Sequence, residues 1–264
     1  MNWTVSLPMY NVSPRLQREY ERMLACVLAD AGVRDEVQLL SEPELPAVWR
    51  RADLLLSQTC GYPYVNALRG LVTLLATPCF DFPGCEGSDY SSVIVTRALD
   101  GVASLAEARG LTAAANDLHS NSGMNALRHA VAPLAREGRF FGKVKWTGSH
   151  AASVRAVREG EADIAAIDCV TFGYLQQEWP ERVEGISILQ YSASAPGLPL
   201  VTARGVPEEV QACLRQALLE PGPQLRAHMR ALRIKAFQHR EDADYRRIER
   251  LEADAVRTGY PALA

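Results

Sequence analysis

Small hydroxyl and amide side chains gather in one stretch near the middle of the chain, directly before a predicted helix. Residues 116–127 read Asn-Asp-Leu-His-Ser-Asn-Ser-Gly-Met-Asn-Ala-Leu and follow an apolar, strand-like run. The first N–H groups of a helix lack partners within it, and the helix dipole places partial positive charge beside them. The stretch is therefore typical of an oxyanion site, with Ser120, Asn121, Ser122 and Gly123 as candidate binding residues. Ordinary helix capping uses the same residue types and is the alternative for this stretch alone.

Two more polar positions are predicted at the same edge of the sheet. A strand at 143–147 leads to Ser149 and His150, and a buried strand at 162–168 ends in Asp168. The carboxyl ends of parallel strands meet at one edge, where open α/β sheets bind ligands. We therefore expect His150 and Asp168 to lie beside the oxyanion site. A structural histidine and a carboxylate that caps the next helix are the competing interpretations.

Strand and helix patterns alternate along the chain and predict an α/β fold with mostly parallel sheets flanked by helices. The first helix, 13–31, has apolar residues at three- and four-residue steps, opens on Ser13 and Pro14, and stops at Gly32. The predicted strands span 5–9, 36–40, 53–57, 71–78, 90–97, 111–115, 143–147, 162–168, 186–190 and 200–204. Further predicted helices include 45–51, 65–69, 104–109, 172–177, 207–219, 224–233 and 244–257.

Composition excludes several classes of protein. The chain has 264 residues, 48% apolar and 22% charged, and a net charge of −3, which describes a globular protein without a basic surface for nucleic acid. No apolar run is long enough to span a membrane, and no metal or cofactor motif is found in the sequence. We expect no cofactor, no metal and a monomer. The start lacks the features of a secretory signal, which predicts a cytoplasmic location, or a periplasmic one if a signal has been removed.

The six cysteines give little support to a redox or metal function. They include no CxxC pair, which argues against a zinc ribbon or a thioredoxin-like motif. Cys79 and Cys85 flank a turn-rich segment and could form a disulfide in an oxidising compartment. Cys60 has no histidine within sequence reach that could serve as its base, so the sequence does not favour it as a nucleophile.

Taken in order, these motifs resemble the substrate-binding proteins of phosphate, phosphite and phosphonate ABC transporters, which have the type 2 periplasmic binding protein fold. The resemblance covers nearly the whole chain. It rests most specifically on Ser-x-Ser-Gly at 120–123 and Gly-Ser-His at 148–150. The supporting segments are 7–10, 61–65, 83–85, 90–95, 116–117 and 160–168.

The resemblance implies two lobes joined by two hinge strands, which close on a ligand held in the cleft between them. Lobe 1 would comprise 1–90 plus 195–264, and lobe 2 would comprise 91–194 and carry the anion-binding helix start. The resemblance also implies that an ABC-transporter permease is the partner. It assigns the phosphonate head group to Ser120, Asn121, Ser122 and Gly123, and further ligand contacts to Tyr10 and Tyr62 of lobe 1 and to Ser91, His150 and Asp168 of lobe 2.

The expected ligand is a small oxyanion of phosphonate or phosphate type. Asp168 would repel a dianion, which favours a ligand that also carries an amine or a proton. The sequence shows no evident nucleophile and base pair, so we expect a binding protein and no enzyme. The alternative is a cytoplasmic enzyme on the same fold that acts on a small carboxylate or on a thiamin or menaquinone precursor, with His150 or His119 as acid or base. A ligand sensor whose arginine-rich C-terminal helices contact a partner is a third hypothesis.

Overall fold

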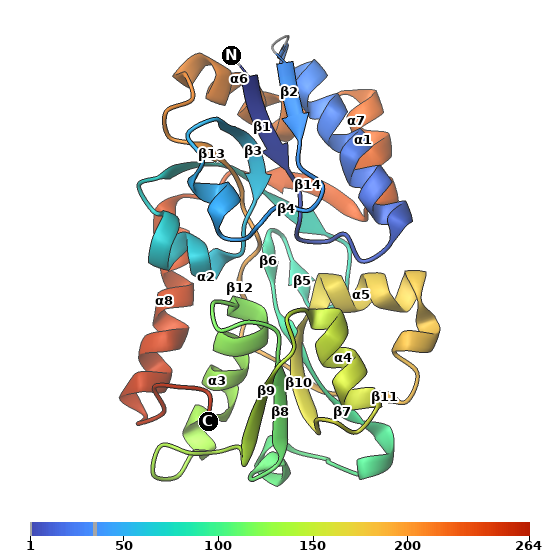
Figure 1. The fold of residues 1–264 in the computed structure, drawn as a ribbon, viewed down its shortest axis with the longest axis vertical. Coiled ribbons are helices and arrows are strands. Elements are labelled where there is room, and N and C mark those ends of the chain that lie inside the picture. The colour runs from blue at the N-terminus through green and yellow to red at the C-terminus, as the bar shows by residue number, and fades with distance from the viewer. Residues whose placement is uncertain (1, 34–35) are drawn as a thin grey trace. The chain divides into compact units, whose positions relative to one another are not determined.

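The computed structural model describes residues 2–33 and 36–264, and contacts within the chain divide it into two compact units (Figure 1). Unit 1 contains the described residues up to Asp81, together with Glu86–Ser88 and Pro196–Tyr245. Unit 2 contains Phe82–Cys85, Asp89–Ala195 and Arg246–Ala264. Each unit is an α/β structure built around its own sheet.

The sheet of unit 1 has the strand order β14-β4-β13-β3-β1-β2. β1 pairs in parallel with β2 and β3, whereas β13 is antiparallel to β3 and β4, and β14 is antiparallel to β4. The strands are β1 (Asn2–Ser6), β2 (Glu36–Leu39), β3 (Leu54–Gln58), β4 (Val72–Phe80), β13 (Leu200–Ala203) and β14 (Ile234–Gln238).

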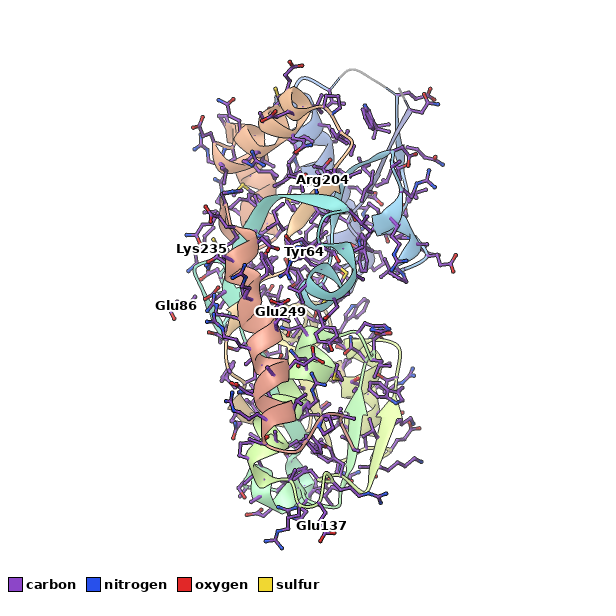
Figure 2. All side chains as sticks on the ribbon, turned by 90° about the vertical axis from the view of Figure 1, so that its left-hand side faces the viewer. Tyr64, Glu86, Glu137, Arg204, Lys235 and Glu249 are labelled. Atoms are coloured by element: carbon purple, nitrogen blue, oxygen red, sulfur yellow. The ribbon has the colours of Figure 1, made fainter. Side chains whose placement is uncertain are left out.

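Helices pack on this sheet as the apolar periodicity predicts. The helices of unit 1 are α1 (Pro14–Asp30), α2 (Gly61–Pro63), α6 (Glu208–Leu219) and α7 (Pro223–Ala231), with the short helical segments η1 (Ala47–Arg50) and η2 (Tyr64–Leu68). α1 begins where predicted, because Ser13 Oγ accepts a hydrogen bond from Leu16 N at 3.2 Å. The buried face of α1 contacts α6 and α7. On η2, the hydroxyl of Tyr64 donates to Asp242 Oδ1 at 2.9 Å (Figure 2 labels Tyr64).

The sheet of unit 2 has the strand order β11-β7-β10-β8-β9. β8 pairs in parallel with β9 and β10, and β7 is antiparallel to β10 and β11. The strands are β7 (Ser92–Arg97), β8 (Thr112–Ala115), β9 (Lys143–Trp146), β10 (Ile164–Asp168) and β11 (Ile186–Tyr191). A separate sheet of short strands, β12 (Ala195–Pro196), β6 (Asp89–Tyr90) and β5 (Cys85–Glu86), forms near the points where the chain passes between units.

The helices of unit 2 follow its strands in sequence. They are α3 (Ala126–Val131), α4 (His150–Arg158), α5 (Cys169–Glu178) and, from Arg246 onward, α8 (Asp242–Arg257). Shorter helical segments are η3 (Ala98–Asp100), η4 (Leu105–Ala108), η5 (Asn121–Asn125), η6 (Ala132–Leu134) and η7 (Pro180–Arg182). Because η5, α3 and η6 are consecutive, 121–134 form one continuous helical run.

The α/β fold class is confirmed, and the sheets are mixed. Most strands of each sheet share one direction, but β13 and β14 in unit 1 and β7 in unit 2 run against it. The chain enters unit 2 shortly before β7 and enters unit 1 shortly before β13. Neither strand is connected by a helix to a preceding strand of its own sheet, and such a connection is what makes two strands parallel. Apolar patterning shows that a strand is buried but does not show its direction. The prediction of mostly parallel sheets rested on the alternation of strands and helices, which does not reveal single strands that run the other way.

The C-terminal segment differs from the predicted division into lobes. The sequence analysis placed all of 195–264 with the first lobe, whereas 246–264 pack in unit 2. The buried Arg128 donates from Nη1 to Pro261 O at 2.8 Å, and its Nη2 lies 3.1 Å from Glu252 Oε1. Ala264 O accepts hydrogen bonds from two backbone N–H groups, at 140 and 141. These contacts are long-range, so the local pattern did not reveal them.

The cysteines are all free thiols in the structure. The suggested Cys79–Cys85 disulfide is not formed in the structure, and the two residues belong to different units. The sulfur beside Cys85 is that of Cys169, with an Sγ–Sγ distance of 3.4 Å.

Candidate functional site

The predicted oxyanion site is a buried helix start in unit 2. β8 ends at Ala115, and the helical run begins at Asn121 after the N-cap Ser120. Ser120 Oγ accepts a hydrogen bond from Gly123 N at 3.0 Å, so the capping interpretation is correct for this oxygen. The Ser120 hydroxyl keeps a proton to donate, and the start of the helical run carries the positive end of its dipole. Ser120, Asn121, Ser122 and Gly123 are all buried.

Ser122 and His150 meet at this helix start. Ser122 Oγ lies 2.9 Å from His150 Nε2. His150 is the first residue of α4, directly after Ser149, whose Oγ accepts a hydrogen bond from Ala152 N at 3.1 Å and caps that helix. Desolvation of the ring lowers the pKa of His150 to about 4. At neutral pH the side chain therefore adds hydrogen-bonding capacity to the site and no positive charge.

Gly123 sits where no larger residue fits. A Cβ at this position would lie 1.8 Å from Asn116 Oδ1 and 3.2 Å from His150 Cε1. Asn116, in the loop after β8, and His150 thus both pack against the backbone of Gly123. Within the described part of the chain, Asn116 Oδ1 and His150 Nδ1 are buried atoms without a hydrogen-bond partner. Two unsatisfied polar atoms beside one glycine mark a place where hydrogen bonds are missing.

Tyr90 and Ser92 complete the wall behind the helix start, and the sequence analysis did not name either as a site residue. Asn121 Nδ2 donates to Tyr90 Oη at 3.2 Å, while Asn121 Oδ1 accepts from Asn125 Nδ2 at 3.1 Å. Ser92 Oγ donates to Ser122 O at 2.9 Å and fixes the first helical turn to β7. Both residues lie in the 90–95 segment that carried the family resemblance, which was the available signal.

Asp168 is a helix cap in the structure. Its Oδ1 accepts hydrogen bonds from Val170 N at 2.8 Å and Thr171 N at 3.0 Å, and the residue is only 2% exposed. Asp168 pairs with Ser92 across β10 and β7, so one residue separates it from the backbone of Ser122. Asp168 therefore caps the next helix, which was the competing interpretation of this carboxylate. A contact between Asp168 and ligand stays a prediction.

The remaining predicted contacts lie elsewhere. Ser91 acts through its backbone, with its N–H donating to Gly84 O at 2.8 Å and its carbonyl accepting from Cys169 N at 3.2 Å. In unit 1, Tyr10 is buried with its ring edge-on to Phe80 at a centroid distance of 5.2 Å, and Tyr62 is buried at the start of α2. The roles of Ser91, Tyr10 and Tyr62 in ligand binding stay predictions.

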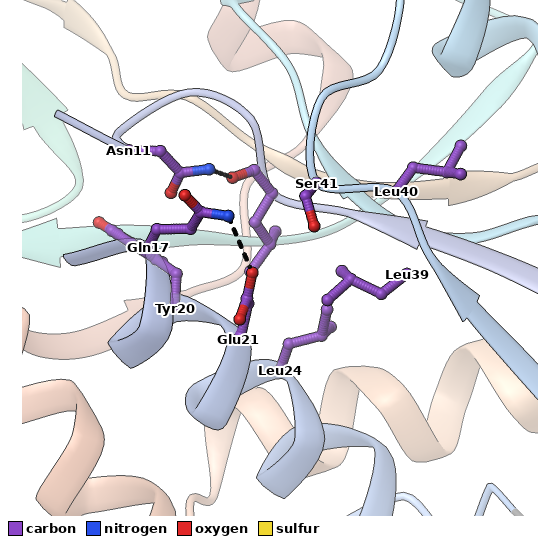
Figure 3. Close-up of a pocket in the computed structure, with 9 residues that line it drawn as sticks. Asn11, Gln17, Tyr20, Glu21, Leu24, Leu39, Leu40 and Ser41 are labelled. Atoms are coloured by element: carbon purple, nitrogen blue, oxygen red, sulfur yellow. Dashed lines mark hydrogen bonds between the residues drawn. The ribbon is translucent and has the colours of Figure 1, made fainter. Parts of the chain in front are cut away.

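A small cavity in unit 1 is not the ligand site. It lies between α1 and the ends of β1 and β2, and its volume of about 10 Å³ is room for about one water molecule (Figure 3). Two hydrogen bonds lie at its wall, from Asn11 Nδ2 to Leu7 O at 3.0 Å and from Gln17 Nε2 to Glu21 Oε1 at 3.1 Å. A phosphonate does not fit this space.

The described chain thus consists of two α/β units with mixed sheets, and unit 2 carries a buried, serine-containing helix start after one of its strands. The family model described as the periplasmic substrate-binding protein of phosphonate ABC transporters matches residues 50–245. The chain belongs to this family. The resemblance found in the sequence is thereby confirmed, as is the function of binding a small oxyanion ligand.

Solved structures agree with this fold. A binding protein component of an ABC phosphonate transporter from Pseudomonas aeruginosa superposes with a TM-score of 0.81 at 19% identity, covering 97% of this chain and 87% of that chain. PhnD1 from Prochlorococcus marinus in complex with methylphosphonate gives a TM-score of 0.77 at 18% identity, covering 96% of this chain and 97% of that chain. The aliphatic sulphonate binding protein SsuA from Escherichia coli gives 0.58 at 10% identity, covering 97% and 85%. The curated proteins contain no match.

Across 2–33 and 36–264, no helix combines the length and the apolar character that crossing a membrane requires.

Proposed function

We propose that the buried helix start of unit 2 binds the phosphonate head group of the family's ligand, and that the chain delivers this ligand to an ABC-transporter permease. Ser120 and Ser122 supply hydroxyl groups, the first turn supplies backbone N–H groups, and His150 supplies a neutral ring nitrogen. The observation that carries this assignment is the 2.9 Å contact between Ser122 Oγ and His150 Nε2 beside the closely packed Gly123. The methylphosphonate bound to the similar protein PhnD1 supports the ligand class.

The Asn116 and His150 atoms without partners add to this argument. A protonated phosphonate oxygen or a ligand amine is a donor for Asn116 Oδ1 and for His150 Nδ1. His150 is then the Nε2–H tautomer, which donates to Ser122 Oγ and leaves the Ser122 hydroxyl proton for the head group. Buried polar atoms cost free energy when they stay unpaired, so a ligand that pairs them gains that energy on binding. Asp168 pairs with Ser92 across the sheet, and its carboxylate would repel a dianion. A phosphonate that carries a proton or an amine avoids this repulsion.

One observation favours the alternative that the chain is an enzyme. A serine hydroxyl within hydrogen-bond distance of a histidine is the arrangement of an activated nucleophile. Such a histidine normally has its second nitrogen oriented by an acceptor and a pKa near the working pH. In the residues that the structure describes, His150 Nδ1 has no partner, and its pKa of about 4 makes it a weak base. We therefore infer recognition and not catalysis.

Calorimetric titration with methylphosphonate tests the site directly. Ser122→Ala removes one hydrogen bond to the charged head group and leaves His150 Nε2 without its partner. We expect a loss of roughly 1.5–3 kcal/mol, which is about a 10- to 150-fold weaker affinity. Ser187→Ala, an exposed serine on β11 of the same unit, is the matched control and should bind like the unmodified chain. Equal affinity for both variants would place the head group elsewhere.

Phosphorus NMR of the same samples separates the two functions. A binding protein returns methylphosphonate and aminoalkylphosphonates unchanged after long incubation and denaturation. A new phosphorus signal that requires Ser122 would establish the enzyme alternative.

A further inference from the structure

Two thiols that the ligand site does not use lie in contact in unit 2. Cys85 Sγ is 3.4 Å from Cys169 Sγ, although 84 residues separate them in the sequence. Cys85 belongs to β5 and is half-buried, whereas Cys169 opens α5, directly after Asp168, and is 2% exposed. A disulfide bond is about 2 Å long, so the sulfurs need to approach by little more than about 1 Å.

The backbone holds the two cysteines side by side through one residue. Ser91 N donates to Gly84 O at 2.8 Å, and Ser91 O accepts from Cys169 N at 3.2 Å. Ser91 therefore links the residue before Cys85 to Cys169 itself. Cys85 N also donates to Phe82 O at 3.0 Å, which closes the turn that carries Cys85. The contact is thus fixed by main-chain hydrogen bonds on both sides.

Gly84 permits the close approach. Its φ of +91° is strained for other residues, and a Cβ there would lie 3.1 Å from Cys169 Cβ and 2.8 Å from the ring of Tyr191. Tyr191, the last residue of β11, is 41% exposed. Burial, followed by the charges of nearby Cys169 and Cys85, raises the pKa of Tyr191. The Tyr191 ring thus lies beside Gly84, the residue before Cys85.

We propose that Cys85 and Cys169 form a disulfide in an oxidising compartment, which covalently ties the β5 segment to the start of α5. The oxidant is a disulfide, either oxidised glutathione or the disulfide of an oxidoreductase. The Cys85 thiolate attacks one sulfur of that disulfide, releases the other as a thiol and forms a mixed disulfide. The Cys169 thiolate then attacks the Cys85 sulfur and expels the second thiol. The cysteine pair loses two electrons and two protons, and the oxidant gains both.

The order of the two attacks follows from exposure. Cys85 is the more accessible thiol, so it meets the oxidant first. The hydrogen bond with Cys85, followed by burial, raises the pKa of the Cys169 thiol, so Cys169 reacts second, when the mixed disulfide is held against it. The completed bond closes a loop of the chain that contains β7, β8, β9 and β10, and with them Ser122 and His150. Such a closed loop restricts the unfolded state of the unit that carries the anion site.

Peptide mapping of the unmodified protein tests the proposal. The protein is equilibrated with oxidised glutathione, its remaining thiols are alkylated, and it is digested without reduction. We expect a linked peptide pair containing Cys85 and Cys169 and an intact mass lower by about 2 Da before alkylation. Alkylation of both residues in the same sample, or a linked pair between Cys85 and Cys79, would overturn the assignment.

Variants then separate the disulfide from other effects of oxidation. Cys79→Ser, the control at the other cysteine that the sequence allowed as a partner of Cys85, should keep the linked pair. Cys169→Ser should lose it and leave Cys85 either alkylated or as its mixed disulfide with glutathione, because no second thiol then resolves that disulfide. The thermal midpoint of the oxidised protein should fall by several degrees on reduction in the unmodified chain and in Cys79→Ser, and stay constant in Cys169→Ser. A midpoint that does not respond to reduction in the unmodified chain would contradict a bond that constrains unit 2.

Discussion

Ser122 Oγ and His150 Nε2 lie 2.9 Å apart although 28 residues separate them in the sequence. Each residue follows a strand of the same sheet, and β8 pairs in parallel with β9 from Thr112 opposite Lys143 to Ala115 opposite Trp146. That register brings the loops after both strands to one edge, where the helical run at 121–134 and α4 begin. One pairing between neighbouring strands thus brings together the two residues of the proposed site.

Replacement of Gly123 by alanine tests how tightly this edge is packed. The new Cβ would overlap Asn116 Oδ1 at 1.8 Å and contact His150 Cε1 at 3.2 Å. We expect unit 2 to lose about 1–3 kcal/mol of stability and methylphosphonate binding to weaken at least tenfold. Gly205→Ala is the control, since a Cβ there meets no atom within 4 Å. Denaturant titration measures the change in stability, and calorimetry measures the change in affinity. An unchanged affinity in Gly123→Ala would show that the backbone at 123 does not shape the site.

The low pKa of His150 predicts how stability depends on pH. The pKa is about 4 in the folded state and about 6.5 in the unfolded state. Between these values the unfolded chain binds the proton and the folded chain does not, so stability falls as the pH is lowered from 6.5 towards 4. The loss should reach about 1–3 kcal/mol.

Denaturant unfolding at a series of pH values measures this loss. His150→Asn should flatten the dependence between pH 4 and 6.5, whereas His119→Asn, at an exposed loop position, should leave it unchanged. Parallel curves for His150→Asn and the unmodified chain would assign the pH dependence to other groups.

Asp168 has a structural role that a conservative variant can separate from a role in binding. Asparagine caps helices about as well as aspartate, so Asp168→Asn should keep the stability of unit 2, while Asp168→Ala should lose about 1 kcal/mol with the cap. If the carboxylate also favours an amine on the ligand, Asp168→Asn should reduce the preference for aminoethylphosphonate over ethylphosphonate by about tenfold. Competition calorimetry with the two ligands gives the ratio. An unchanged ratio in Asp168→Asn would leave Asp168 as a cap alone.

Arg128 should hold the C-terminal segment on unit 2. It is 4% exposed, donates to Asn125 Oδ1 at 2.7 Å and to Pro261 O at 2.8 Å, and pairs with Glu252 at 3.1 Å. Arg128→Ala leaves the buried Asn125 Oδ1 without this donor and removes the bonds to Pro261 and Glu252, and we expect a loss of about 1–3 kcal/mol. Hydrogen exchange of 246–264 should accelerate. Arg257→Ala is the control: it removes an exposed ion pair with Asp254 and should change the hydrogen exchange of 246–264 little. Equally slow hydrogen exchange in both variants would refute the role of Arg128.

The sequence by itself determined the α/β alternation, the start of α1 at Ser13, and the polar helix start at 120–123. These features are local: an N-cap is recognised from residues three or four positions apart, and a buried strand from its own composition. The family resemblance used the same local motifs in order. Asn116 was within the stretch that opened the sequence analysis, and only its packing against Gly123 showed that it belongs to the site.

The tertiary structure decided which distant residues meet. The direction of β7 and β13, the assignment of 246–264 to unit 2, the Ser122–His150 contact and the Cys85–Cys169 contact all depend on strand pairing between distant segments. Hydrophobic patterning shows that a strand is buried and does not show its neighbour or its direction. For the same reason, the sequence left open whether Asp168 caps a helix or whether Cys79 lies beside Cys85, whereas packing made Asp168 a helix cap and placed Cys169 beside Cys85.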